Sequence, residues 1–348
     1  MLFADPTLIE LYRDLHIDRA WSVCAPTHFT WWADQQAQHI TLQADDDALD
    51  DDDAGVLIAV RTEVLRGLTL DATAASALNS RLMAFASLAG PIHDPATGTV
   101  TLHSLLRVHD DTRPWLTRLL SLAALLQISE ARRLAPELAR LLGAEVAVSG
   151  PPARGVRPVA DEMTAVVPRL IAPQGCAPSR WRAAEFLDTR DRYLHQPPAV
   201  LATGDGAGLT VEFPWDETHT ALLQIMNDQP HPEYGNGLFV LQSFPVGDLN
   251  EAAGQHLALR LNTVELAEEP AGYGLGSYCY QRNRLHFVSF FPNFAYRRGL
   301  LPNLYYAAAR RAQALAVRFT RQDWIASSFA PAHTGIGRML RQASHGNR

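Results

Sequence analysis

The sequence predicts an α+β fold of two tandem α-β-β-β-α-β-β-α units, each an antiparallel sheet with helices packed on one face. Residues 101–138 and 285–319 share one layout, an apolar strand, a polar corner and a long Arg-containing helix, about 185 positions apart. The expected strands alternate apolar and polar residues, and the middle and last helices each carry one apolar stripe, which is typical of a sheet covered on one side. We therefore expect one unit used twice.

The first unit is expected over residues 1–149. Apolar residues at helical spacing predict its helices, with Asp5 and either Asp71 or Thr73 as N-caps and Gly143 as the C-terminal signal. Pro136 is expected to kink the last helix or to split it in two. The predicted elements are a helix over 6–18, strands over 28–33, 39–44 and 55–65, a helix over 70–88, strands over 90–96 and 99–108, and a helix over 112–142.

The second unit is expected over residues 179–321, after a connector over 150–178 whose six prolines predict a stiff spacer with one short helix over 161–167. A basic tail over 322–348 follows, with one further helix over 336–343. The predicted elements of the second unit are a helix over 180–194, strands over 199–203, 209–214, 220–227 and 237–246, a helix over 249–266, strands over 274–281 and 284–291, and a helix over 301–319.

The composition narrows the classes of function. The net charge of −7 argues against nucleic acid as a general partner. The sequence contains no lysine, which excludes a Walker A loop, a kinase-type lysine and a pyridoxal phosphate Schiff base. This bias is typical of GC-rich genomes, such as those of actinobacteria. No apolar run reaches the roughly 18 residues of a membrane span and the N-terminus lacks a basic leader, so we expect a cytoplasmic protein.

Several possible ligand sites have a simpler interpretation. The three cysteines lie far apart, which suggests neither a disulfide framework nor a metal site. Seven aspartates within residues 45–53 predict a solvated loop, and the alternative calcium site lacks the glycine and the last Glu of an EF-hand. His103 and His109 lack further zinc ligands at suitable spacing. The glycine-rich stretches 204–208 and 272–276 are expected to be turns, because strands follow them.

The order of elements resembles the type III secretion chaperone-like fold, which includes the bacterial YbjN family of sensory-transduction-regulator-like proteins. In the first unit the resemblance is carried by the helix with Leu78-Asn79, the strand TVTLHSLLRVHDD and the long helix after it. In the second it is carried by the helix with Leu261-Asn262, the strand RLHFVSFFPN and the last helix. The resemblance is one of topology and apolar pattern over most of both units. Members are typically small homodimers that hold partner proteins. The resemblance therefore implies two fused protomers here, arranged as a pseudo-twofold internal dimer.

The most distinctive local string is HPEYGNG, residues 231–237, between two apolar strands. It places His231, Glu233, Tyr234 and Asn236 on one loop, where binding residues are common and where His with Glu can perform acid–base work. The alternative is a tight hairpin connection, which the proline and glycines of the string favour.

Two further groups are candidate partner-binding residues. Trp31 and Trp32 fall on opposite faces of a strand, so one is expected in the core and the other at the seam between units or in a partner surface. The basic tail contains Arg338 and Arg341, which can contact an acidic partner or residues 45–53. The alternative for the tail is a solvated helix face.

We expect a non-enzymatic protein that binds another protein or peptide, by strand addition at a sheet edge or by a helix in a groove. No catalytic, cofactor-binding or metal-ligating residue is predicted, and neither nucleic acid nor membrane is an expected partner. Because the pseudo-dimer is internal, a monomer or weak dimer is expected. The alternatives are an enzyme with a site near residues 231–236 and a regulatory module in which one unit supports the other.

Overall fold

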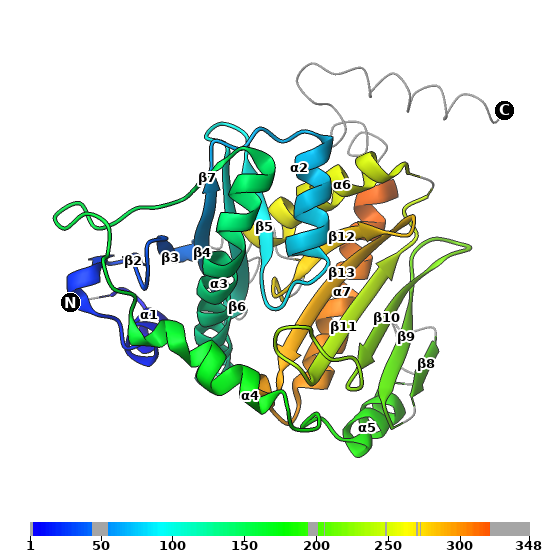
Figure 1. Ribbon diagram of the computed structural model, residues 1–348. Coiled ribbons are helices and arrows are strands. Elements are labelled where there is room, and N and C mark those ends of the chain that lie inside the picture. Colours follow the sequence, from blue (N-terminus) through cyan, green and yellow to red (C-terminus); the bar gives the residue numbers. More distant parts are fainter. Residues whose placement is uncertain are drawn as a thin grey trace.

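Two antiparallel β-sheets organise the chain, one built from each half of the sequence (Figure 1). The computed structural model describes residues 3–43, 55–193, 201–204, 206–247, 249–268, 271 and 273–320. The predicted α+β class with antiparallel sheets is confirmed. Within these described residues, no helix combines the length and apolarity needed to cross a membrane. The acidic run over 45–53 and the basic tail over 322–348 lie outside the described residues.

The first sheet has the strand order β1-β2-β3-β4-β6-β5, and a short β7 pairs with β4. Its central strands β4 and β6 pair along most of their length, with Ala59 opposite Leu105. The strands are β1 Ser22–Ala25, β2 His28–Trp31, β3 Gln38–Gln43, β4 Val56–Arg66, β5 Gly90–Asp94, β6 Thr99–Val108 and β7 Glu145–Val146.

The second sheet has the strand order β12-β13-β11-β10-β9-β8. The hairpin between β12 and β13 turns through Arg282 and Asn283, whose φ angles of +51° and +59° are those of a tight two-residue turn. The strands are β8 Leu201–Gly204, β9 Gly208–Pro214, β10 Thr220–Met226, β11 Gly237–Phe244, β12 Ser277–Gln281 and β13 Arg284–Pro292.

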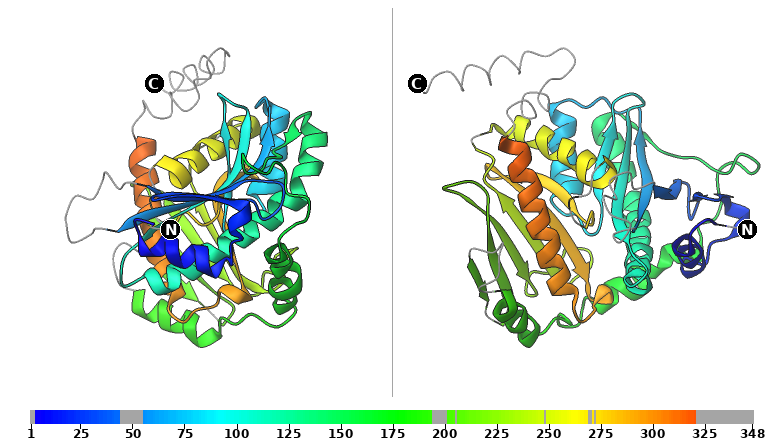
Figure 2. Two further views of the ribbon diagram at one scale, coloured as in Figure 1. Left: turned by 90° about the vertical axis from the view of Figure 1, so that its left-hand side faces the viewer. Right: turned by 180° about the vertical axis from the view of Figure 1, so that it is seen from behind.

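Long helices cover the sheets: α3 packs on β4 and β6, and α7 lies along the second sheet (Figure 2). The predicted N-caps are present, since Asp5 accepts from Thr7 N and Asp71 accepts from Ala74 N, both at 2.7 Å. The α-helices are α1 Pro6–Asp14, α2 Ala72–Leu78, α3 Arg113–Leu142, α4 Ala172–Gln174, α5 Ala183–Tyr193, α6 Glu251–Thr263 and α7 Leu300–Thr320.

Several local predictions differ from the structure. The connector helix predicted over 161–167 is instead a 3-10 turn, Glu162–Ala165, followed by a π-helical turn, Val167–Ile171. Strand β1 was not predicted, because none of its four residues is buried and no alternation marks it. Helix α3 is not split but continues through Pro136. Pro136 lies on the exposed side of α3, where the carbonyl that loses its hydrogen bond can be hydrated.

Polar contacts inside the first half fix the position of α3. The Gln127 side chain donates to Val60 O at 3.1 Å and to Ser104 Oγ at 2.8 Å, and it accepts from Thr62 Oγ1 at 2.8 Å. These bonds join α3 to both central strands and satisfy buried polar groups. They also hold Glu130, almost one helical turn further along, at a defined place beside the second half.

The outer edge of β12 is closed by two asparagine side chains. Asn79 lies where α2 passes into a π-helical turn; its Oδ1 accepts from Tyr280 N at 2.8 Å and its Nδ2 donates to Tyr280 O at 3.0 Å. From α6, Asn262 Oδ1 accepts from Tyr278 N at 2.7 Å. The two amides take the place of a neighbouring strand, and Asn79 reaches across from the other half of the chain.

Backbone hydrogen bonds also cross the seam between the halves. Leu105 on β6 exchanges bonds with Gly274, in both directions at 2.9 Å. Phe290 on β13 donates from its N to Ser87 O at 2.9 Å. All four residues are buried, and α2 and α6 pack together beside them (Figure 1). The seam is therefore a filled core at these positions and not an open groove.

Candidate functional site

The loop over residues 231–235 closes on itself and docks against the first half. His231 and Gly235 exchange backbone hydrogen bonds, His231 N to Gly235 O at 2.8 Å and Gly235 N to His231 O at 2.9 Å. Gly235 has a φ of +67°, a conformation in which glycine carries no steric penalty. This is the geometry of a tight turn, and it fixes the side chains between its ends.

Both ring nitrogens of His231 are engaged. Nε2 lies 3.0 Å from Phe85 O, and Nδ1 accepts from Glu233 N at 3.1 Å. This pattern requires the proton on Nε2, which donates to the carbonyl. Burial lowers the pKa of His231, which keeps the ring neutral. His231 therefore tethers the loop to the first half and has no ring nitrogen left to act as a base.

A buried carboxyl group stands behind this loop. Glu130 on α3 accepts hydrogen bonds from the hydroxyls of Tyr234, at 3.0 Å, and Ser87, and both bonds go to the same oxygen, Oε1. Burial raises the pKa of Glu130 to about 7, although the two hydroxyls and Arg133 act in the opposite direction. Burial likewise raises the pKa of Tyr234 well above its ordinary value. Glu130 is thus partly protonated at neutral pH.

Glu130 and the loop line a cavity of about 210 Å³, which we call the loop cavity. Its wall includes Arg133, which pairs with Glu233 at 3.3 Å, and Arg81, which pairs with Glu137 at 3.4 Å outside the wall. The second half contributes only the loop, and the other lining residues come from the first half. Two of the predicted loop residues, Tyr234 and Glu233, therefore contact titratable groups that lie far away in sequence, Glu130 and Arg133.

Glu130 is expected to make stability depend on pH. Its pKa is raised from 4.5 to about 7 on folding, so the folded protein binds this proton more readily, and stability falls as pH rises between those values. From pH 5 to pH 8 the loss is on the order of 2 kcal/mol. Glu130→Gln should lack this loss, so the free energy of unfolding of the variant should rise relative to that of the wild type as pH rises. Urea unfolding of both proteins at the two pH values measures the difference.

Glu137→Gln is the matched control, because Glu137 lies on the same helix with its side chain 44% exposed. It should follow the wild type at both pH values. An equal stability difference between wild type and Glu130→Gln at pH 5 and pH 8 would contradict the assignment.

The other predicted site residues lie apart from the loop cavity. Trp31 and Trp32 are both buried, and Trp32 Nε1 donates to Ser149 Oγ at 3.0 Å, so neither indole presents a surface. Asn236 Nδ2 donates to Ala177 O at 3.0 Å and so ties the loop to the connector. Arg338 and Arg341 lie outside the described residues.

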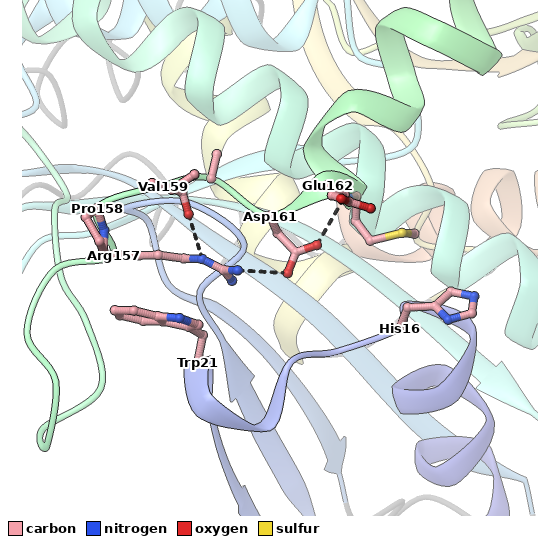
Figure 3. A pocket seen from close by; sticks show the side chains of 9 residues that line it. His16, Trp21, Arg157, Pro158, Val159, Asp161 and Glu162 are labelled. Carbon is pink, nitrogen blue, oxygen red and sulfur yellow. Dashed lines mark hydrogen bonds and ion pairs between the residues drawn. The ribbon is translucent and has the colours of Figure 1, made fainter.

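The connector forms a second, larger pocket against the first sheet, with a volume of about 640 Å³ (Figure 3). Arg157 organises this connector pocket: its guanidinium donates to Trp32 O at 2.8 Å, pairs with Asp161 at 3.1 Å and lies 5.3 Å from the centre of the Trp21 ring. Asp161 in turn caps the following 3-10 turn by accepting from Met163 N at 3.0 Å. These contacts pack the connector on the first half.

The wall of the connector pocket offers apolar and aromatic surface next to β1. Trp21 directly precedes β1, and Val159, which also lines the pocket, is 74% exposed. His16 and Glu162 supply polar groups at the sides (Figure 3). The Arg157 guanidinium is engaged by Val159 O, Trp32 O and Asp161, so the apolar wall is the part of the pocket without such internal contacts.

Sequence reasoning missed Glu130 and the Trp21–Arg157 contact. A signal for Glu130 was present, because it stands four residues from both Leu126 and Leu134 and so falls on the apolar stripe of α3. No comparable signal joined Trp21 to Arg157, which lie more than one hundred positions apart. Among the described residues, no group of three or more His, Cys, Asp or Glu side chains gathers to hold a metal ion.

Comparisons with known proteins gave no match: neither a protein-family model nor a curated protein nor a solved structure is similar to this chain.

Proposed function

We propose that this protein is a non-enzymatic, protein-binding adaptor, built as a fused pseudo-dimer of chaperone-like units. Its binding surface is the outer edge of β1 together with the connector pocket, and its partner contributes an extended segment that adds a strand to the first sheet. The observation that carries the proposal is an edge strand whose outer hydrogen-bonding side has no backbone partner among the described residues, next to a pocket with an apolar wall.

The pairing of equivalent elements supports the pseudo-dimer. Strands β5, β6, β4, β3, β2 and β1 of the first sheet follow the same order as β12, β13, β11, β10, β9 and β8 of the second. Leu105 and Phe290, which correspond in the repeat, each bond across the seam to the segment that precedes the opposite edge strand. Such reciprocal contacts are what a twofold interface produces.

Strand β1 supports the location of the binding surface. Its hairpin with β2 closes at Ala25 and His28, and Trp32 N donates to Trp21 O at 3.0 Å. By the alternation of an antiparallel ladder, Ser22 and Cys24 then direct their backbone groups away from β2. Among the described residues, no backbone hydrogen bond outside the β1–β2 ladder involves residues 22–25. The β12 edge, by contrast, is closed by its two asparagines.

Strand addition would supply affinity through main-chain bonds, and a side-chain pocket beside the strand would supply selectivity. The connector pocket begins at Trp21, immediately before β1, so a side chain of an added strand would reach it. The exposed Val159 and the Trp21 ring favour an apolar or aromatic side chain.

The alternative of an enzyme at the 231–236 loop has less support. A general base needs a free acceptor within reach of its substrate, and both nitrogens of His231 are already bonded. The neutral ring is well suited to hold the loop against Phe85.

The adaptor function is tested by capture from native lysate with a strand-blocking variant. Cys24→Pro removes an outward N–H and blocks a neighbouring strand, while proline is tolerated on a sheet edge. The wild type should capture a stoichiometric partner, and Cys24→Pro should lose most of it. Mass spectrometry of the eluted proteins measures the ratio.

Cys24→Ala is the matched control, because it makes a similar change of side chain and keeps the N–H; it should capture the partner as the wild type does. Val159→Asp should weaken capture by placing a charge on the apolar wall. Absence of any stoichiometric partner, or equal capture by the proline and alanine variants, would contradict the proposal.

A further inference from the structure

The loop cavity combines opposite charges with an apolar wall. Glu130 and Glu233 supply two carboxyl groups, and Arg81 and Arg133 supply two guanidinium groups. The net charge of these four side chains is therefore zero when both acids are ionised. Such a lining favours neither a ligand with only negative charge nor one with only positive charge. It suits a molecule that carries both charges.

Glu130 provides a binding position for the positively charged group of such a ligand. Both of its hydrogen bonds go to Oε1, and Oε2 has no partner among the described residues. The side chain is mostly buried and yet lines the cavity, so Oε2 is the acceptor that a donor entering the cavity would meet. An ammonium group would give Oε2 a charge-assisted hydrogen bond and compensate the buried negative charge.

Arg133 provides a binding position for the negatively charged group of the ligand. It pairs with Glu233 through a single contact of 3.3 Å between half-exposed side chains. Exposed pairs of this kind contribute roughly 0–1 kcal/mol, so the guanidinium can exchange its partner at little cost. A carboxylate inside the cavity offers Arg133 a bidentate contact. Glu130 and Arg133 lie three residues apart on α3, a spacing that places their side chains next to each other and sets the two ends of the ligand close together.

The size and the apolar wall limit the rest of the ligand. A volume of about 210 Å³ is below the roughly 300–1,000 Å³ of pockets that take drug-sized ligands, which favours a small molecule. Leu82 and Leu134 form an apolar wall, and Phe85 beside them is 54% exposed. Such a wall favours a branched or aromatic side chain.

We propose that the loop cavity binds a free α-amino acid with an apolar side chain, its ammonium on Glu130 and its carboxylate on Arg133. The site joins the two halves, since the loop of the second half closes a cavity whose charged groups come mainly from the first. Binding does not depend on the β1 edge, so this proposal and the adaptor function can fail separately.

The test is calorimetric titration of the full-length protein with L-leucine and two truncated probes, isocaproate without the ammonium and isoamylamine without the carboxylate. L-leucine should bind saturably, and each truncated probe should bind at least about tenfold more weakly, as expected for the loss of one charge-assisted contact. Glu130→Gln and Arg133→Gln should each weaken L-leucine by about the same factor.

Arg132→Gln is the matched control, because Arg132 is the neighbouring residue of α3 and pairs instead with Asp34 at 2.8 Å; it should leave the affinity within about twofold. Circular dichroism confirms that each variant is folded. No saturable heat with L-leucine up to ~10 mM would overturn the proposal. So would a truncated probe that binds as tightly as L-leucine, or an Arg133→Gln protein with unchanged affinity.

Discussion

Replacing Arg311 with leucine is expected to destabilise the protein by about 3–5 kcal/mol. Arg311 on α7 pairs with Glu265 at 2.9 Å, and the two side chains are only 5% and 2% exposed. It also donates to Gln242 Oε1 at 3.2 Å and to Tyr273 O at 2.9 Å. Without the guanidinium, the Glu265 carboxylate stays in a dry core without its counter-charge. Equilibrium urea unfolding of wild type and variant measures the loss.

The double variant Arg311→Leu with Glu265→Leu separates loss of packing from loss of charge balance. In the proposed correspondence of the halves, Leu126 and Leu82 occupy the positions of Arg311 and Glu265, and both are buried. An apolar pair is therefore compatible with this place in the fold, and the double variant should recover most of the stability. Arg310→Leu, an exposed neighbour, should have little effect. A double variant as unstable as Arg311→Leu would show that the charge is not the cause.

Asn79→Ala is expected to cost about 2–4 kcal/mol, because it removes both bonds from the Asn79 amide to the Tyr280 backbone at a buried seam. The effect should be local as well as global. Amide hydrogen exchange in β12 should accelerate, since this edge of the strand loses its cover. Urea unfolding and exchange measured on the same samples give the two results.

Ser80→Ala is the control for this prediction, because Ser80 is exposed and bonds only within its own helix. It should match the wild type within about 0.5 kcal/mol. Asn262→Ala should also accelerate exchange in β12, as it removes the equivalent cover from Tyr278. Unchanged exchange in β12 after Asn79→Ala would refute the role given to this side chain.

Local patterns predicted most elements of the fold, and the errors have local causes. The capped N-terminal ends of the helices and the bounds of the long alternating strands were predicted within a few residues. Strand β1 was missed because neither of its faces is buried, so its residues show no alternation. The effect of Pro136 was overestimated because the sequence did not indicate that this residue lies on the solvent side of α3. Both outcomes were decided by tertiary surroundings and not by propensity.

The candidate sites were less predictable because they join distant segments. The 231–237 string was identified from its composition alone, but its partner Glu130 is an ordinary acidic residue within a helical pattern. The connector was predicted as a spacer from its prolines, whereas Arg157 packs it onto Trp32 and Trp21. Contacts of this kind depend on which surfaces meet after folding, and no single stretch of sequence records them.

The asparagine closure of β12 has a consequence for how the chain reaches its final form. Asn79 and Tyr280 are 201 positions apart. During synthesis the first sheet therefore leaves the ribosome well before β12, the strand whose edge Asn79 covers. The closing step joins two tethered parts of one molecule, and its rate should be independent of protein concentration, unlike the association of separate subunits. Such a distant closure is expected to be the slow, late event of folding.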